Sequence, residues 1–242
     1  MKTYFILILT IFYFAFPSIA AETFEGKLTL SGKTTGKNAG EYSFPLLIQG
    51  DKLLFQADEK MKVVINSKSG DMHILTENQG NKMAIKLNLK YLESAGGLKT
   101  FMGSSAPFDM STIERMDDEQ TMKKTSETKN INGQQCRKYL VDDEAWSGHI
   151  WVSENPPYDF SGLYSVLDIK SVTGLPLSGS LKSKKDDSTQ DFDMKFEKMS
   201  LNSEQFSIGS NVQIIDVSMM LQNQDPKQVE EMIKQMLPPE AK

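Results

Sequence analysis

The chain has 242 residues, with 27 Lys and Arg against 32 Asp and Glu, and a single cysteine. Its formal charge of −5 arises from both signs interspersed along the chain, which does not favour binding to nucleic acid or to an anionic membrane surface. One cysteine cannot form an internal disulfide, so packing must stabilise the fold.

The first twenty residues have the pattern of a secretory signal peptide. Lys2 precedes an apolar run of thirteen residues that ends before Pro17, and small Ser18 and Ala20 occupy the positions that a signal peptidase inspects. Thirteen apolar residues are too few to span a bilayer. We therefore predict a signal peptide over 1–20, cleavage after Ala20, and export to the periplasm of a Gram-negative bacterium or to the medium.

The remaining 222 residues are predicted to form one β-rich domain, 21–242, without a transmembrane segment. From Phe24 to Leu87, short runs alternate apolar and polar residues and are separated by Gly, Asn, Asp and Ser, a pattern typical of antiparallel strands joined by hairpins. Strands are predicted again over 122–131, 134–143, 148–154, 175–184 and 191–201. Asn132-Gly133 gives the strongest hairpin signal, because both turn positions require positive φ.

Three segments have helical periodicity. They cover 87–97, 158–169 and 225–237, and the last has an N-cap at Asp225 followed by Pro226. The resulting fold class is α+β, mainly antiparallel β, as a strongly curved sheet or half-barrel with a few helices on its concave face.

Motifs for catalysis and metal binding are weak. Residues 31–37, SGKTTGK, lack the glycine spacing of a phosphate loop and are interpreted as a polar loop between strands. The two histidines, His73 and His149, lie in different predicted strands, and one thiol cannot build a zinc cluster. We therefore predict no cofactor, no metal site and no enzymatic activity.

The stretch from 128 to 161 contains a Lys-x-Ile-x-Gly turn, a Cys, a Lys-Tyr pair and a Gly-x-Ile-Trp-Val strand. The positions are Lys129, Ile131, Gly133, Cys136, Lys138, Tyr139, Gly148, Ile150, Trp151 and Val152. This pattern resembles the DUF4412 family of exported bacterial proteins of unknown function. The resemblance implies a LolA-like, lipoprotein-carrier-like half-barrel with a hydrophobic cavity under its helices. It implies structural roles for Gly133, Cys136, Lys138, Tyr139, Gly148 and Trp151, and no catalytic residues.

The leading functional hypothesis is a non-enzymatic exported protein that holds a lipid or other hydrophobic ligand between sheet and helices. Methionines fill core gaps or provide a deformable apolar surface, and the pattern fits both uses. The candidate cavity residues are Leu163, Val166, Leu167, Met219, Met220, Val229, Met232, Ile233 and Met236. The alternative is an envelope structural or protein-interaction module without a small-molecule ligand. An enzyme would need a cleft that joins Asp142 or Glu144 to His149.

Overall fold

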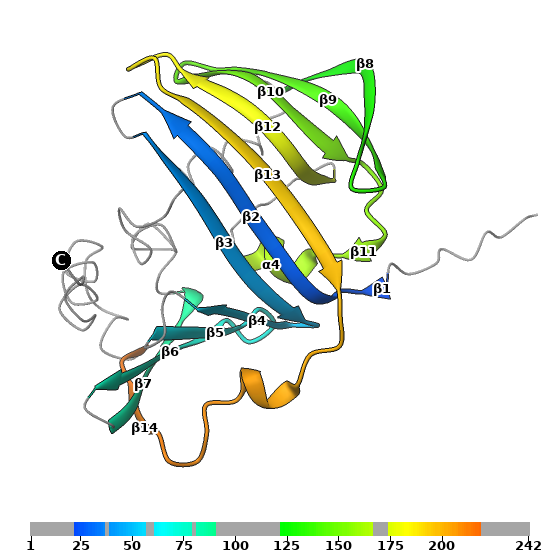
Figure 1. Ribbon diagram of the computed structural model, residues 1–242. Coiled ribbons are helices and arrows are strands. Elements are labelled where there is room, and N and C mark those ends of the chain that lie inside the picture. The colour runs from blue at the N-terminus through cyan, green and yellow to red at the C-terminus, as the bar shows by residue number, and fades with distance from the viewer. Residues whose placement is uncertain are drawn as a thin grey trace, which may run out of the picture.

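The computed structural model describes residues 22–36, 39–56, 61–78, 81–90, 122–166 and 174–218, and most of them are in strands (Figure 1). Twelve strands form one sheet in the order β14-β7-β6-β5-β4-β3-β2-β13-β12-β10-β9-β8. All neighbours are antiparallel except β14 and β7, which are parallel. The strands are β2 (Glu25–Thr35), β3 (Gly40–Gln49), β4 (Lys52–Gln56), β5 (Met61–Asn66), β6 (Asp71–Asn78), β7 (Asn81–Asn88), β8 (Met122–Ile131), β9 (Gln134–Asp142), β10 (Trp146–Ser153), β12 (Leu175–Ser183), β13 (Thr189–Lys198) and β14 (Gln213–Asp216).

Four shorter elements complete the described structure. After β10 the chain forms β11 (Tyr158–Asp159), which pairs in parallel with β1 (Glu22–Thr23), and then the helix α4 (Ser161–Val166). A 3-10 helix, η3 (Ser203–Phe206), follows β13. Within the described segments, no helix has the length and apolar character that crossing a membrane requires.

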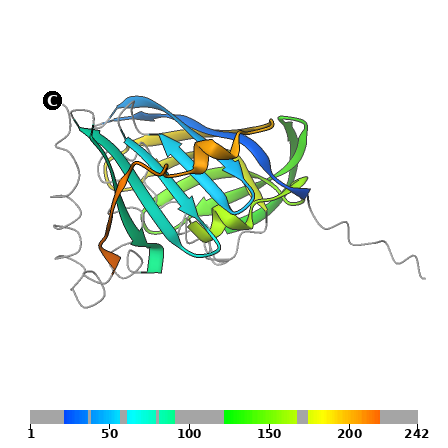
Figure 2. The same cartoon turned by 90° about the horizontal axis from the view of Figure 1, so that it is seen from below.

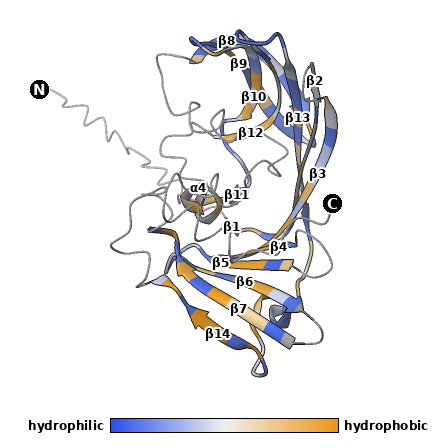
Figure 3. Cartoon of the chain, turned by 90° about the vertical axis from the view of Figure 1, so that its left-hand side faces the viewer, coloured by the Kyte–Doolittle hydropathy of each residue, from blue (hydrophilic) through white to orange (hydrophobic). Residues whose placement is uncertain are grey.

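The sheet is strongly curved and open, and it bends around α4 (Figure 3). Successive side chains of a strand point to opposite faces, so the alternating burial along β3 and β13 separates a concave from a convex side. The concave side carries the main buried cluster, which includes Leu46 and Met194 of the sheet together with Leu163 of α4. The helix therefore covers part of the concave face.

The convex side has a smaller cluster of its own. Phe206 of η3 is buried against Leu54 and Val64, which alternate with the concave residues of β4 and β5. Figure 2 shows η3 crossing the outer side of these strands. The β3–β6 part of the sheet is thus buried on both faces, as the apolar runs KLLF and KVVI suggest.

Two glycines on the concave face lie directly under aromatic rings. A Cβ atom on Gly32 would collide with the Tyr42 ring and with the Asp191 carbonyl, and one on Gly179 would collide with the Phe192 ring. Tyr42 is the register partner of Gly32 on β2, and Phe192 is the partner of Gly179 on β12. Glycine within a strand marks a close approach or a bend, and here it lets each ring lie flat across the neighbouring strand.

The sequence predicted most strands correctly. The meander from β2 to β7 is confirmed by the sheet order, and so is the 132–133 hairpin, where Asn132 has φ 52° and Gly133 has φ 79°. The polar loop at 31–37 is wrong over Ser31–Thr35, which belong to β2. The polar composition suggested a loop because the outward-facing residues of this part of β2 meet solvent and the inward-facing position is occupied by Gly32.

The prediction of a few helices on the concave face is not borne out in the described residues, where α4 is the single α-helix with assigned bounds. Tyr158 and Asp159 of the predicted 158–169 helix are extended because they pair with β1. Residues 87–88 of the predicted 87–97 helix end β7, residues 89–90 are helical, and residues 91–97 lie outside the described residues. The predicted helix at 225–237 and the signal peptide also lie outside them. The parallel strand β14 was not predicted.

The glycine and aromatic contacts predict a specific stability pattern. Gly32→Ala and Gly179→Ala should each lower the free energy of unfolding by about 1 to 3 kcal/mol, because the added methyl group overpacks a buried contact. Gly40→Ala is the matched control, since nothing lies within 4 Å of its added Cβ. It should change stability by less than about 0.5 kcal/mol. Urea unfolding measures all three, and equal stabilities would contradict the proposed role of the two glycines.

Candidate functional site

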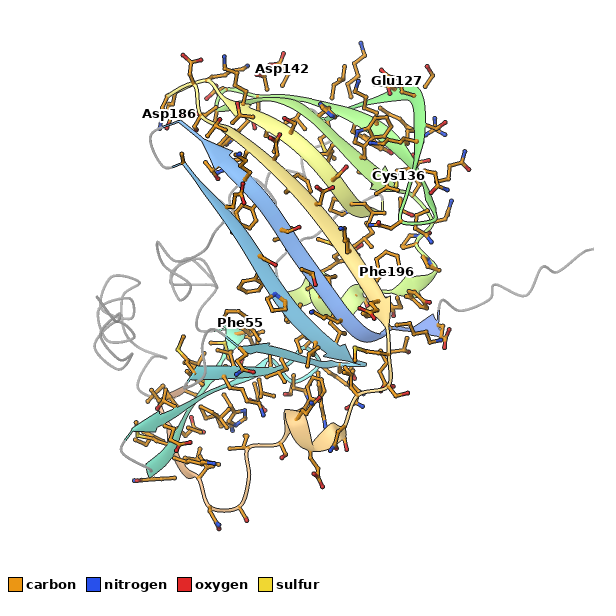
Figure 4. The ribbon with its side chains drawn as sticks, in the orientation of Figure 1. Phe55, Glu127, Cys136, Asp142, Asp186 and Phe196 are labelled. Carbon is orange, nitrogen blue, oxygen red and sulfur yellow. The ribbon has the colours of Figure 1, made fainter. Side chains whose placement is uncertain are left out.

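The lower half of the concave face is closed by α4 and the segment before it. Phe24, which is fully buried, packs against Tyr158, Phe160 and Phe196 with ring centroids 5.1 to 6.1 Å apart. This aromatic cluster joins β2 and β13 to the chain that leaves β10, and it fixes the position of α4. Figure 4 shows Phe196 pointing from β13 toward α4. Leu163 and Val166 are accordingly buried core residues.

Beyond α4, the concave face presents partly exposed apolar side chains. We define the concave apolar surface as Leu30, Tyr42, Phe44, Phe55 and Met61, all of which are half-buried. They belong to β2, β3, β4 and β5, and they point to the concave side by register with the main cluster. The Phe44 and Phe55 rings stack with centroids 4.1 Å apart and planes at 18°. These residues form a continuous apolar row across four neighbouring strands.

A charged network occupies the other end of the same face. Glu154 accepts hydrogen bonds from Lys124 Nζ at 2.5 Å, from Arg137 Nε at 3.1 Å and from the Tyr139 hydroxyl at 2.7 Å. These donors lower the pKa of Glu154 to about 2, with the Lys124 bond as the largest cause. Burial and the Glu154 contact raise the pKa of Tyr139 to about 12. The network ties β8 and β9 to the end of β10.

The residues that carry the resemblance of the 128–161 stretch form one local structure. Gly133 closes the β8–β9 turn, and a Cβ on Gly148 would collide with the Ser180 carbonyl, so glycine permits the close approach of β12. Lys129 Nζ and Lys138 Nζ lie 5.7 and 5.9 Å from the centroid of the Trp151 ring, within the range of cation–π contacts. These contacts and the Tyr139–Glu154 hydrogen bond connect β8, β9 and the end of β10, and the structural roles of the residues in this stretch stay a prediction.

Cys136 lies on β9 near the hairpin (Figure 4). It is 1% exposed, it is a free thiol, and burial raises its pKa. Alternation along β9 left open which face is buried. Tyr139 and Val141 are buried and Leu140 is exposed, so the face of β9 that carries Tyr139 points inward. Alternation places Cys136 on the other face, but it is also buried because it packs in the main cluster near the hairpin.

Groups that would indicate catalysis are separated. Asp142 pairs with Lys184 at 2.6 Å on the surface, while the charged groups acting on His149 are Lys138, Glu127, Asp191 and Lys129. Burial lowers the pKa of His149 and of His73. Among the described side chains, no set of three or more His, Cys, Asp or Glu is grouped to hold a metal ion. Neither Asp142 nor Glu144 is among the charged groups that act on His149.

Sequence reasoning identified α4 and the hairpin but missed the concave apolar surface and the Glu154 network. The alternation of Tyr42, Phe44, Leu46 and Ile48 along β3 was a usable signal for the first. The Glu154 network has no sequence signal, because its members come together only when β8, β9 and β10 pair. The remaining predicted cavity residues lie outside the described residues and stay a prediction. They are Leu167, Met219, Met220, Val229, Met232, Ile233 and Met236.

Comparisons with known proteins give distant likenesses only. No protein-family model matches the chain, and no curated protein does. A structure of PNGF-II is 15% identical with a TM-score of 0.37 and covers 86% of this chain, which spans 33% of the length of PNGF-II. A DUF1329 family protein from Desulfovibrio piger is 11% identical, with a TM-score of 0.33 over 77% of this chain and 91% of that one.

A LolA superfamily protein from Nitrosomonas europaea is 10% identical, with a TM-score of 0.24 over 78% of this chain and 92% of that one. TM-scores of this size carry no weight for fold or function. The geometry of the concave face therefore has to support any functional conclusion by itself.

The Glu154 network predicts an acid-sensitive contribution to stability. Glu154→Gln should lower the free energy of unfolding by about 1 kcal/mol at pH 7, because charge-assisted bonds are lost and solvent screens part of their strength. The folded-state pKa of Glu154 is depressed to about 2, so this difference is present above pH 4.5 and fades as the pH falls toward 2. Urea unfolding at several pH values measures it. Asp142→Asn, in an exposed pair, is the control, and a pH-independent difference would refute the assignment.

Burial of Cys136 predicts an unreactive thiol. An alkylating reagent should label the native protein slowly and the urea-unfolded protein rapidly, because the folded thiol is inaccessible and its raised pKa disfavours the thiolate. Cys136→Ala should cost about 1 kcal/mol of stability and leave ligand binding unchanged. Fast labelling under native conditions would show that Cys136 is reactive and not structural.

Proposed function

We propose that the protein is a non-enzymatic binding protein that holds a hydrophobic ligand against the concave apolar surface. The observation that supports this function is the row from Leu30 through Phe44 and Phe55 to Met61, whose apolar side chains are only half-buried although they lie inside the curve of the sheet. Apolar, aromatic-lined concave surfaces are the usual form of small-molecule sites. The predicted signal peptide would place this activity outside the cytoplasm.

The distribution of polar groups agrees with this location. Between β3 and β5 the concave positions are apolar, whereas charged side chains such as Lys52 and Glu41 lie at strand ends or on the convex face. The Glu154 network lies at the opposite edge, where its carboxylate is already bonded to three donors. An apolar ligand is therefore favoured next to Phe44 and Phe55, away from the ionised groups.

The alternative, a protein-interaction module, is favoured by a different feature. The edge strand β14 is exposed throughout, and its Ile214 and Ile215 are 51% and 40% exposed. Edge strands with exposed apolar side chains pair readily with other chains. The opposite edge strand, β8, is rich in charged residues, which disfavour such pairing. A specific partner that binds through β14, without a bound hydrophobic ligand, would support this alternative.

Ligand binding to the concave apolar surface can be tested with a neutral fluorescent naphthylamine probe. Phe44→Ala and Phe55→Ala should each weaken probe binding about fivefold, which corresponds to about 1 kcal/mol of lost apolar contact. Leu140→Ala is the matched control, because Leu140 is an exposed apolar residue whose side chain leaves β9 on the side opposite Tyr139. Equal affinities in all three variants, or no probe binding to the unmodified protein, would reject the proposed function.

A further inference from the structure

Two buried polar atoms on the concave face have no hydrogen-bond partner. They are the Tyr42 hydroxyl and the Gln190 side-chain carbonyl oxygen, and they are the two unpartnered atoms found among the buried side chains that the structure describes. Leaving such a group unpaired costs about 1 to 3 kcal/mol, and native proteins satisfy nearly all of them. Two of them on one face need partners that the described protein groups do not supply.

The strand register places the two groups near one another. Tyr42 on β3 is opposite Gly32 on β2, and Gln190 on β13 is opposite Thr34, two residues along β2. Because the hydroxyl end of the Tyr42 ring lies over Gly32, it has crossed onto β2 and faces β13. Gln190 points to the same side as Phe192, two residues away on β13. Gly32, which lies under the Tyr42 hydroxyl, and Gln190 are thus one strand spacing apart across the sheet and two residues apart along it, roughly 8 Å between backbone positions, a separation that the glutamine side chain is long enough to shorten.

The surroundings define the chemistry of the missing partner. Leu30, Leu181 and Phe192 are apolar neighbours on this face and Thr34 lies beside Gln190, so the two polar atoms lie at the polar end of the concave apolar surface. Burial, together with Asp191 and Asp193 on the other face, raises the pKa of Tyr42 to about 12, so its hydroxyl stays a neutral donor. The same two carboxylates disfavour an anionic group at this position. The site therefore suits a neutral group that accepts one hydrogen bond and donates another.

We propose that Tyr42 and Gln190 bind the hydroxyl group of a neutral, single-chain amphiphile whose apolar chain lies along Phe44 and Phe55. This inference rests on the proposed function, since it names the ligand class of the same surface. The Tyr42 hydroxyl donates to the ligand oxygen, and the ligand hydroxyl donates to the Gln190 carbonyl. A fatty alcohol or an acylglycerol has this chemistry, and an ionised fatty acid lacks the proton that Gln190 accepts.

Three ligands of equal size separate the two hydrogen bonds. 1-Decanol accepts and donates, 1-methoxynonane only accepts, and undecane does neither. We expect 1-decanol to displace the naphthylamine probe from the purified protein about fivefold better than 1-methoxynonane, and 1-methoxynonane about fivefold better than undecane, as one net hydrogen bond implies in each case.

Variants of Tyr42 and Gln190 test which residue makes each of the two hydrogen bonds. Gln190→Met should abolish the preference for 1-decanol over 1-methoxynonane, and Tyr42→Phe should weaken both oxygen-containing ligands about fivefold while leaving undecane unchanged. Tyr164→Phe is the matched control, because the Tyr164 hydroxyl already donates to the Gly174 carbonyl at 3.2 Å and should not affect these ratios. The ligand-free Tyr42→Phe protein should unfold at a temperature no lower than the unmodified protein, since its lost hydroxyl has no partner to lose.

The outcomes distinguish the two levels of the proposal. If all three ligands displace the probe equally, the hydrophobic surface is real and the assignment of Tyr42 and Gln190 is wrong. If the preference for 1-decanol survives Gln190→Met, the assignment is also wrong. If the probe itself does not bind, there is nothing for the ligands to displace, and the proposed function fails together with this inference.

Discussion

The close contact between glycine and aromatic rings on the inner face is the constraint on which the rest of the structure depends. A sheet curves toward one face when the side chains on that face leave room for neighbouring strands to approach. Gly32 and Gly179 provide this room, and Tyr42 and Phe192 fill it with flat rings instead of upright side chains. Both contacts lie on inner strands of the twelve-stranded sheet, which curves around α4 (Figure 3).

The second determinant is how the chain crosses the concave face. After β10, the Pro156-Pro157 pair prevents continuation of the strand, and the chain passes under the curve to pair with β1 before α4 begins. The aromatic cluster around Phe24 fixes this crossing, and α4 then buries the lower half of the concavity. The apolar row from Leu30 to Met61 lies beside this helix and remains half-buried. The position of the candidate site is thus set by the part of the concave face that α4 leaves uncovered.

The contrast between predicted and observed structure has a physical basis. Period-two alternation and Asn132-Gly133 are local signals. They located the meander and the β8–β9 hairpin because strands that follow one another in the sequence pair in the sheet. The exceptions are non-local: β14 adds in parallel to β7 across more than a hundred residues, and Tyr158 is extended only because β1 is its partner. Tyr42, Gln190 and Glu154 become recognisable only when the register shows which polar atoms have partners. Alternation can place Tyr42 and Gln190 on one face of their strands, but it does not show which atoms remain unpaired.

The two polar arrangements on the concave face have different consequences for a ligand. The Glu154 carboxylate already accepts hydrogen bonds from three donors, so it has little capacity left to bind a ligand. At Tyr42 and Gln190 a donor and an acceptor remain unpaired within apolar surroundings. From Gln190 on β13 to Met61 on β5 the row crosses four strand spacings, roughly 19 Å along the sheet, which is a length suited to one extended hydrocarbon chain. The polarity of this row, with hydrogen-bonding groups at one end and stacked phenylalanines beyond them, gives a bound amphiphile one orientation: its hydroxyl lies at β2 and β13, and its chain points toward β5.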